Sequence, residues 1–126
     1  MESLVIKGTV KTPTIIFNPD GNLIIKGKSI PESVFRLYTP VIDWIRECKA
    51  EYVTFNIDLE YINSSSKLML LELFKMLEAN KNVRHITLNW HYDIEDEDNL
   101  DIGQIFEDSL TRSKFTYVGY VASFSL

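Results

Sequence analysis

Two stretches of alternating apolar and polar residues constrain the fold of this chain more than any other feature. Apolar side chains occupy every second position over residues 53–59 and again over residues 86–92. Successive side chains of a strand point to opposite faces of a sheet, so each stretch predicts a strand with one buried and one polar face. Two such strands indicate a sheet that helices cover on one side only.

An amphipathic helix is predicted after each of these strands. Helical periodicity covers residues 65–79 after the first strand, and residues 99–110 after the second strand and an acidic loop at 93–98. Strands that alternate with helices in the sequence pair in parallel, through crossover connections.

Further strands are predicted at both ends of the chain. Residues 15–17 and 23–25 flank a Pro-Asp-Gly turn and predict a hairpin, because glycine there tolerates a positive φ. Residues 4–6 predict a short edge strand, and residues 115–124 predict the last strand.

The segment Ser29-Ile30-Pro31-Glu32 has the pattern of a capping box and predicts the start of the first helix. Pro40 lies inside that helix and predicts a kink or a break, with Thr39 as a second cap. Together the elements predict a single domain over residues 1–126 with an α/β fold. We expect a two-layer sandwich in which the helices lie mainly on one face of a mixed sheet.

Composition narrows the classes of function. The 126 residues carry a formal net charge of -5, which disfavours a general grip on nucleic-acid phosphates. Cys48 is the only cysteine, so we expect no intramolecular disulfide and no cysteine zinc site. No apolar run reaches the length of a signal peptide or a membrane span, so we expect a cytoplasmic protein without membrane insertion.

Metal and cofactor sites are not predicted either. The acidic residues over 93–101 do not match an EF-hand, whose sixth position is glycine. His85 and His91 lie six residues apart on one strand, about 20 Å, which is too far for one metal ion. No phosphate-binding loop or nucleotide fingerprint is present.

Three consecutive serines, Ser64, Ser65 and Ser66, stand where the first alternating strand meets its helix. We expect Ser64 to be the N-cap, and capping alone would account for it. A phosphate on Ser64 would add about -1.5 to -2 charges at a helix end that favours anions. Lys67, one turn into the helix, would pair with that phosphate or remain a solvated lysine.

The same junction resembles the STAS domains of anti-sigma factor antagonists. In those domains an Asp-Ser-Ser-Gly motif occupies the strand-to-helix turn, and its first serine is phosphorylated. Here Asn63 replaces the aspartate and Ser66 replaces the glycine.

Motifs along nearly the whole chain resemble the SiaC-type family of bacterial regulatory phosphoproteins, which have a STAS-like fold. The residues that carry this resemblance include the following, in order: 4–9, Lys11-Thr12-Pro13, Ser29-Ile30-Pro31-Glu32, Pro40, Ile42-Asp43-Trp44, Tyr61-Ile62-Asn63-Ser64-Ser65-Ser66-Lys67, and Asn89-Trp90-His91-Tyr92 followed by acids.

The resemblance implies a function and its site. A protein kinase would phosphorylate Ser64 and a PP2C-type phosphatase would remove the phosphate. The unphosphorylated form would bind and activate a diguanylate cyclase in cyclic di-GMP (biofilm) signalling. The partner-binding residues would surround the phosphoacceptor: Tyr61, Asn63, Ser65, Ser66 and Lys67.

Other classes of function stay open at this point. One is an anti-sigma factor antagonist of the STAS type. Another is a small enzyme on the polar sheet face, with His85, His91 and Asp58 as acid–base groups; a deep pocket around them would favour it, and a flat face would not. A third is a structural module whose serines only cap a helix.

Overall fold

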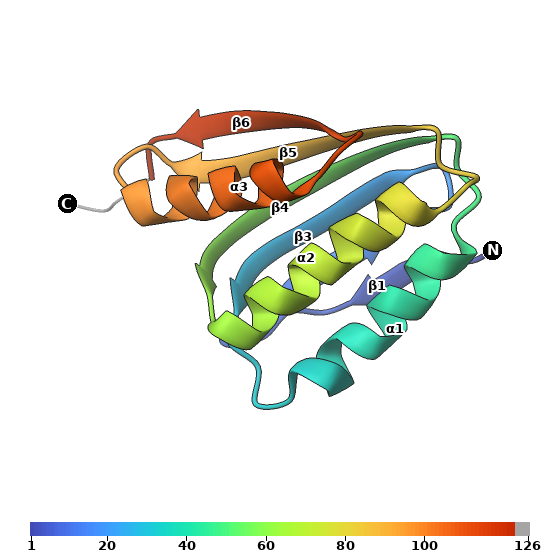
Figure 1. Cartoon of the computed structure of the whole chain (residues 1–126). Helices are drawn as coiled ribbons and strands as arrows, with labels where there is room; N and C mark the ends of the chain where they lie inside the picture. Colours follow the sequence, from blue (N-terminus) through green and yellow to red (C-terminus); the bar gives the residue numbers. More distant parts are fainter. Residues whose placement is uncertain (123–126) are drawn as a thin grey trace.

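The two alternating stretches form central strands of a six-stranded mixed sheet in the computed structural model of the chain (Figure 1). The structure describes residues 1–122. In chain order its elements are β1 (Leu4–Ile6), β2 (Thr14–Phe17), β3 (Asn22–Ser29), α1 (Val34–Glu47), β4 (Tyr52–Ile62), α2 (Ser64–Ala79), β5 (His85–Asp93), α3 (Glu97–Ser109) and β6 (Lys114–Tyr120). Among these residues, no helix combines the length and apolar character that crossing a membrane requires.

The strands lie in the sheet in their sequence order, from β1 to β6. The first three pair antiparallel, and the hairpin between β2 and β3 turns at Gly21, whose φ of 101° confirms the predicted turn. From β3 to β6 all neighbours are parallel.

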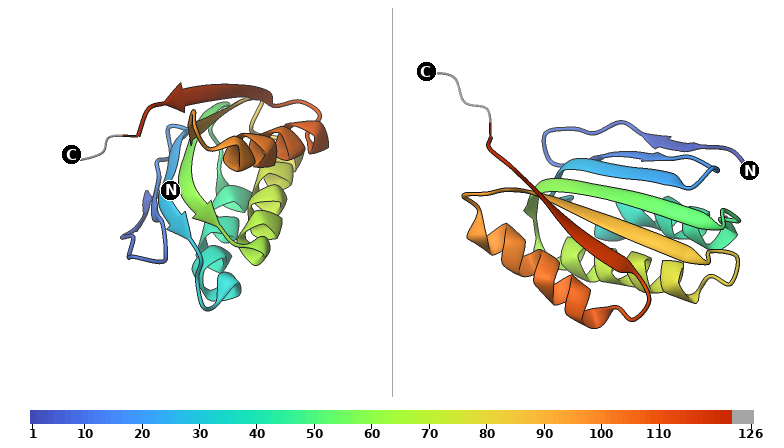
Figure 2. Two further views of the ribbon diagram at one scale, coloured as in Figure 1. Left: turned by 90° about the vertical axis from the view of Figure 1, so that its left-hand side faces the viewer. Right: turned by 90° about the horizontal axis from the view of Figure 1, so that it is seen from above.

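One helix connects each pair of neighbouring parallel strands. Crossovers share one hand, and the strand order here never reverses, so successive helices lie on the same side. Figure 2 shows all three helices under one face of the sheet. The predicted two-layer sandwich with a mixed sheet and helices on one face is therefore confirmed.

The core fills the space between the sheet and the helices. Edge-to-face aromatic pairs link each helix to the sheet: the ring centroids are 5.3 Å apart for Trp44 of α1 and Phe17, 5.7 Å for Phe74 of α2 and Phe55, and 5.4 Å for Phe106 of α3 and Trp90. Such pairs add stability beyond the area that they bury. Seven of the eight apolar positions of the two alternating stretches are buried in this layer, and the eighth, Tyr92, is half-buried against it; the buried ones are Val53, Phe55, Ile57, Leu59, Ile86, Leu88 and Trp90.

The start of the first helix differs from the prediction. Ser29 is the last residue of β3 and is fully buried, so it does not cap a helix. The N-cap of α1 is Ser33, whose hydroxyl accepts a hydrogen bond from the Arg36 N–H at 3.3 Å. The predicted capping box is therefore wrong: its serine, Ser29, is a buried strand residue.

Pro40 does not break α1, which is one element over Val34–Glu47. Thr39 is not a second cap, since its hydroxyl donates to the Phe35 carbonyl at 2.6 Å within the helix. Packing of an amphipathic face supplies most of a helix's stability in a protein, and here it outweighs the hydrogen bond that proline removes.

The start of α3 and the end of β6 also differ from the prediction. α3 begins at Glu97 rather than at Asn99, because the Asp96 carboxylate caps it and accepts from the Asn99 N–H at 3.0 Å. β6 ends at Tyr120, short of the predicted end at residue 124, and residues 123–126 lie outside the described part of the chain.

Candidate functional site

The serine-rich turn lies where β4 ends and α2 begins. The N-cap of α2 is Asn63, whose side-chain oxygen accepts from the Ser66 N–H at 2.9 Å and from the Ser65 hydroxyl at 3.2 Å. The expectation that Ser64 is the cap is therefore wrong. Asn63 precedes the helix in extended backbone conformation, which aims its short side chain at the free N–H groups. Ser64 becomes the first helical residue.

The three serines have different environments. Ser66 is fully buried, Ser65 is exposed and hydrogen-bonded to the cap, and Ser64 is exposed. The Ser64 hydroxyl has no hydrogen bond to any other described residue. Ser64 is thus the one serine of the three that offers a free hydroxyl at the surface.

Ser66 belongs to a buried hydroxyl cluster that joins three elements. Its hydroxyl accepts from the Ser29 hydroxyl of β3 at 2.8 Å, and Ser29 is 2.6 Å from the Tyr38 hydroxyl of α1. Burial raises the pKa of Tyr38, although the hydrogen bonds to both serines oppose that rise. The cluster anchors the first turn of α2, and Ser66 has no exposed surface for a partner.

The end of α2 at Ser64 suits an anion. The first turn contains no acidic residue. The N–H groups of the first helical residues have no partner within a helix, and only those of Ser66 and Lys67 bond to the cap residue Asn63. Lys67 is half-buried on the same turn.

A groove of about 350 Å³ opens at Ser64 and runs between α2 and α3. We call it the α2–α3 groove. Its lining is almost wholly apolar and consists of Ser64, Lys67, Leu68, Leu71, Ile102, Ile105 and Phe106. Sequence reasoning missed this groove, because the α3 side chains that complete it are brought there only by the tertiary fold.

Tyr61 and Lys28 flank the turn on the sheet side. Tyr61 is 61% exposed, and the Lys28 ammonium lies 5.2 Å from the centre of its ring. The geometry is that of a cation–π contact. Of the six site residues predicted from the sequence, the structure leaves Tyr61, Ser64 and Ser65 exposed and Asn63 and Lys67 half-buried.

A second hollow lies beyond Tyr61, at the carboxyl ends of β4 and β5. Its lining is strongly acidic and includes Asp58, Glu60, Asp93 and Asp96. Tyr120 donates to Asp58 at 3.2 Å; burial, together with the charge and hydrogen bond of Asp58, raises the pKa of Tyr120 to about 12. Among residues 1–122, no group of three or more acidic, histidine or cysteine side chains is arranged to hold a metal ion.

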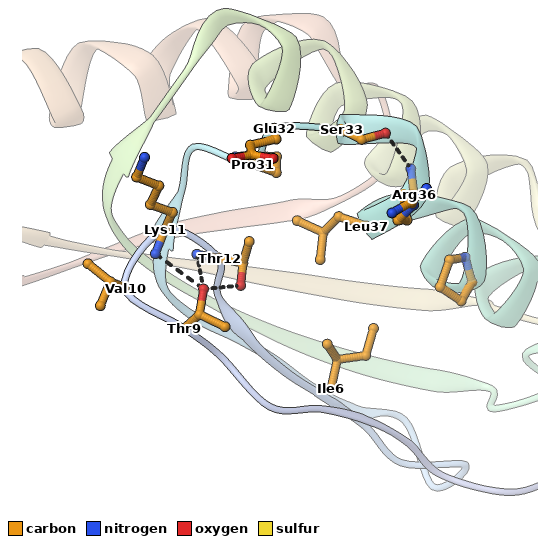
Figure 3. A pocket seen from close by; sticks show the side chains of 11 residues that line it. Ile6, Thr9, Val10, Lys11, Thr12, Pro31, Glu32, Ser33, Arg36 and Leu37 are labelled. Atoms are coloured by element: carbon orange, nitrogen blue, oxygen red, sulfur yellow. Dashed lines mark hydrogen bonds between the residues drawn. The ribbon is translucent and has the colours of Figure 1, made fainter.

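A third hollow lies between the loop before β2 and the start of α1 (Figure 3). The Thr9 hydroxyl is 2.7 Å from the Thr12 hydroxyl and accepts from the N–H groups of Lys11 and Thr12. These hydroxyls hold the loop in shape. No histidine or cysteine is among the residues that line this hollow.

The three candidate acid–base groups of the polar sheet face do not share one hollow: Asp58 lines the acidic hollow, whereas the two histidines do not. His91 bonds to the Asn56 side-chain oxygen at 3.0 Å, whereas His85 stacks on Tyr52 at the other end of the strands, with ring centroids 4.7 Å apart. Neither histidine lines any of the three hollows. None of the three hollows therefore brings the two histidines together with Asp58.

Comparison with known proteins places the whole arrangement in a family. Residues 6–120 match the family model described as SiaC family regulatory phosphoprotein. An uncharacterized protein of Pseudomonas aeruginosa strain UCBPP-PA14 is 32% identical over 113 residues, which cover 86% of this chain and 90% of that protein.

Solved structures agree with the family match. SiaC of Pseudomonas aeruginosa superposes with a TM-score of 0.85 at 29% identity, over 95% of this chain and 100% of that one. A chain in the crystal structure of the diguanylate cyclase SiaD in complex with its activator SiaC, also from Pseudomonas aeruginosa, superposes with a TM-score of 0.84 at 30% identity. It covers 93% of this chain and 99% of that chain.

Proposed function

The chain belongs to the SiaC family of regulatory phosphoproteins, and we propose that it is a phosphorylation-controlled activator of a diguanylate cyclase. In this proposal it has no catalytic activity of its own and works in the cytoplasm. Its unphosphorylated form binds and activates the cyclase. A kinase adds a phosphate to Ser64 and ends that contact, and a PP2C-type phosphatase restores it.

One observation carries the choice of Ser64. Among the three serines of the turn, only Ser64 combines an exposed position with a hydroxyl that no other described residue engages. A kinase needs access to the hydroxyl oxygen, and Ser66 in the buried cluster gives none. Ser65 is accessible, but its hydroxyl already donates to Asn63.

The physical effect of the phosphate is local. About -1.5 to -2 charges arrive beside the free N–H groups of α2, where the helix dipole favours them. Lys67 is on the same turn and would pair with the phosphate. The helix keeps its structure, so the change is confined to the surface. A partner seated there would have to remove water from a dianion, which opposes binding.

We place the partner-binding surface on the residues around Ser64. Tyr61, Asn63, Ser65 and Lys67 are exposed or half-buried and lie next to Ser64 in the chain. Ser66 contributes through the buried cluster, which holds the turn in the shape that the partner meets.

The activity assay uses the diguanylate cyclases of the source organism, each purified and mixed with the chain. Wild-type protein and the Ser64→Ala variant should raise cyclic di-GMP production by one of these cyclases. Protein carrying genetically encoded phosphoserine at position 64 should not. The proposal fails if no cyclase responds, or if the phosphorylated and unphosphorylated forms activate equally.

The site of modification is tested separately. The chain is co-expressed with candidate protein kinases of the source organism, and the phosphate is located by mass spectrometry. Wild type and Ser65→Ala should carry phosphate, and Ser64→Ala should carry none. Phosphate on Ser64→Ala at the wild-type level would move the switch to another residue.

A further inference from the structure

We infer that the acidic hollow at the carboxyl ends of β4 and β5 binds a linear organic cation with two or more ammonium groups, that is, a diamine or a polyamine. The carboxylates that line the hollow would hold the ammonium groups; they belong to Asp58, Glu60, Asp93 and Asp96. Binding of this kind needs neither the phosphate nor the cyclase of the proposed function.

The hollow lies where the sheet splits between β4 and β5. The two strands pair only as far as Ile57 and Trp90, although β4 runs on to Ile62 and β5 to Asp93. On either side of the split the pairing continues, between β3 and β4 to Ile62 and between β5 and β6 to Asp93. In open α/β sheets, ligands bind in a crevice outside the carboxyl ends of the strands, and this split provides such a crevice.

The negative charge of the lining is not balanced within the chain. Its four carboxylates are accompanied by one ammonium, that of Lys26. Asp58, Asp93 and Asp96 are half-buried, and each accepts a hydrogen bond from a neutral hydroxyl or N–H group. Among residues 1–122, no lysine or arginine donates a hydrogen bond to any of the four. A cationic ligand would supply the missing charge.

The phenol of Tyr120 senses this negative field. Its hydroxyl donates to Asp58, from β6 to β4, at 3.2 Å. Burial raises the pKa of Tyr120, and the charges of Asp58, Glu60 and Asp93 raise it further, to about 12. Because three carboxylates act on one phenol, their fields overlap, and a cation in the hollow would be attracted by all three.

One buried side chain of the lining lacks a hydrogen-bond partner. Asn99, in the first turn of α3, lines the hollow and is 6% exposed. Its side-chain nitrogen donates to the Leu59 carbonyl of β4 at 3.2 Å, whereas its side-chain oxygen is buried and unpaired among the described residues. Buried acceptors in native proteins are nearly always paired. An ammonium group in the hollow brings the donor that this oxygen lacks.

The spacing of the carboxylates favours a chain of charges over a single ion. Asp58 and Glu60 are two residues apart on one strand, which places their Cα atoms roughly 6.5 Å apart. Asp93 comes from the next strand, and Asp96 caps α3. Within the described part of the chain, residues 1–122, these groups do not converge as the ligands of a metal ion do. Ammonium groups separated by a few methylene groups match such a spread.

The rest of the lining suits the carbon chain between the charges. Tyr61, Tyr120, Val121 and Ala122 add aromatic and apolar surface to the acidic groups. The Tyr61 ring already lies 5.2 Å from the Lys28 ammonium, in the geometry of a cation–π contact. With a volume of about 680 Å³, the hollow has the size of a small-molecule site.

The test titrates the full chain at low salt with spermidine, putrescine and butylamine, which carry successively fewer ammonium groups, and measures binding by calorimetry. Affinity should fall in that order, because each missing ammonium removes a charge-assisted contact. Asp58→Asn and Asp93→Asn should each weaken spermidine binding about 10-fold or more. Both amides keep an acceptor oxygen for the native donors, the Tyr120 hydroxyl and the Glu95 N–H.

Asp43→Asn is the matched control. It removes the same charge from an exposed position on α1 that does not line the hollow, so spermidine binding should stay within about twofold of wild type. Equal weakening by the control and the hollow variants would mean diffuse attraction to an acidic protein and would overturn the inference. So would the absence of saturable binding below about 1 mM spermidine. Glu60→Gln replaces either hollow variant that lowers the melting temperature.

Nuclear magnetic resonance locates the ligand on isotope-labelled protein. Spermidine should shift the side-chain amide signal of Asn99 and the backbone signals of Asp58 and Asp93, and it should leave those of α1 unchanged. Shifts spread over all acidic segments would overturn the inference.

Two competing ligands complete the test. Tighter binding of Mg²⁺ or Ca²⁺ alone than of spermidine would make the hollow a metal site. Tighter binding of a short peptide with adjacent lysines, which offers the same ammonium groups on a protein backbone, would assign the hollow to a lysine-rich segment. Either result overturns the inference.

Discussion

The carboxylate of Glu78 ties the end of α2 to the loop between α3 and β6, and removing its charge should lower stability in a pH-dependent way. One carboxylate oxygen accepts from the N–H groups of Arg112 and Ser113 at 2.8 and 2.9 Å and from the Ser113 hydroxyl at 2.8 Å. Both oxygens lie 3.1 Å from the Thr111 N–H. This contact fixes the far end of the helix pair that forms the α2–α3 groove.

The magnitude for Glu78→Gln follows from these contacts. Glutamine keeps an acceptor for Arg112 and Ser113 but turns an NH₂ group toward the Thr111 N–H. Hydrogen bonds to a charged group contribute about 1.5–3 kcal/mol and neutral ones about 0.5–1.5 kcal/mol, so we expect a loss of about 1–2 kcal/mol at neutral pH.

The loss should depend on pH in one direction. Burial acts to raise the pKa of Glu78, but the hydrogen bonds from residues 111–113 outweigh it and hold that pKa below its ordinary value of 4.5. A lowered folded pKa means that the stabilisation is fully present above pH 4.5 and is lost as the pH falls through the folded pKa. Wild type and Glu78→Gln should therefore converge in acid.

Urea unfolding measures this, with fluorescence of the two buried tryptophans as the signal. The free energies of unfolding of wild type and Glu78→Gln are compared at pH 7 and in steps down to pH values below 4.5. Glu72→Gln is the control, because Glu72 is exposed on the same helix and makes no hydrogen bond to the described residues. A difference that is absent at pH 7, or that stays constant into acid, would refute the reasoning.

Three further predictions concern the core and the acidic hollow. Gly103→Ala should lower stability by about 1–2 kcal/mol in the same urea assay despite alanine's better helix propensity, because the new methyl would lie 2.8 Å from the Trp90 ring. Cys48 should not react with a thiol reagent until the protein unfolds, since it is fully buried and burial raises its pKa; rapid labelling of the native protein would contradict this. In an alkaline absorbance titration Tyr120 should ionise near pH 12, and Asp58→Asn should lower that midpoint. An unchanged midpoint would mean that the Asp58 charge does not reach the phenol.

Much of the fold follows from local pattern. The alternation over 53–59 and 86–92 predicted two one-faced strands, and the sheet buries their apolar faces under helices. Periodicity is reliable here because a one-residue slip would turn every apolar side chain to the wrong face. Helix ends were harder to predict, because the cap is whichever nearby polar side chain accepts hydrogen bonds from the free N–H groups of the first turn.

The turn before α2 illustrates that difficulty. Asn63 and Ser64 are both good capping residues, and the sequence places them side by side. In the structure Asn63 is the N-cap of α2, and the Ser64 hydroxyl is therefore not needed for capping. Likewise, nothing local separates Ser66 from its neighbours; its partner Ser29 lies 37 residues away in the chain.

The sequence by itself indicated the family through its motifs, and it determined the order of strands and helices and the one-sided covering of the sheet, because these two depend on periodicity along the chain. Only the tertiary structure decided which serine is buried, which one is free, and what lies next to it. The α2–α3 groove exists because β5 and β6 carry α3 alongside α2, so that side chains more than 30 residues apart in the sequence line one surface. A surface shared by two helices is a property of their packing and has no signature in either helix alone.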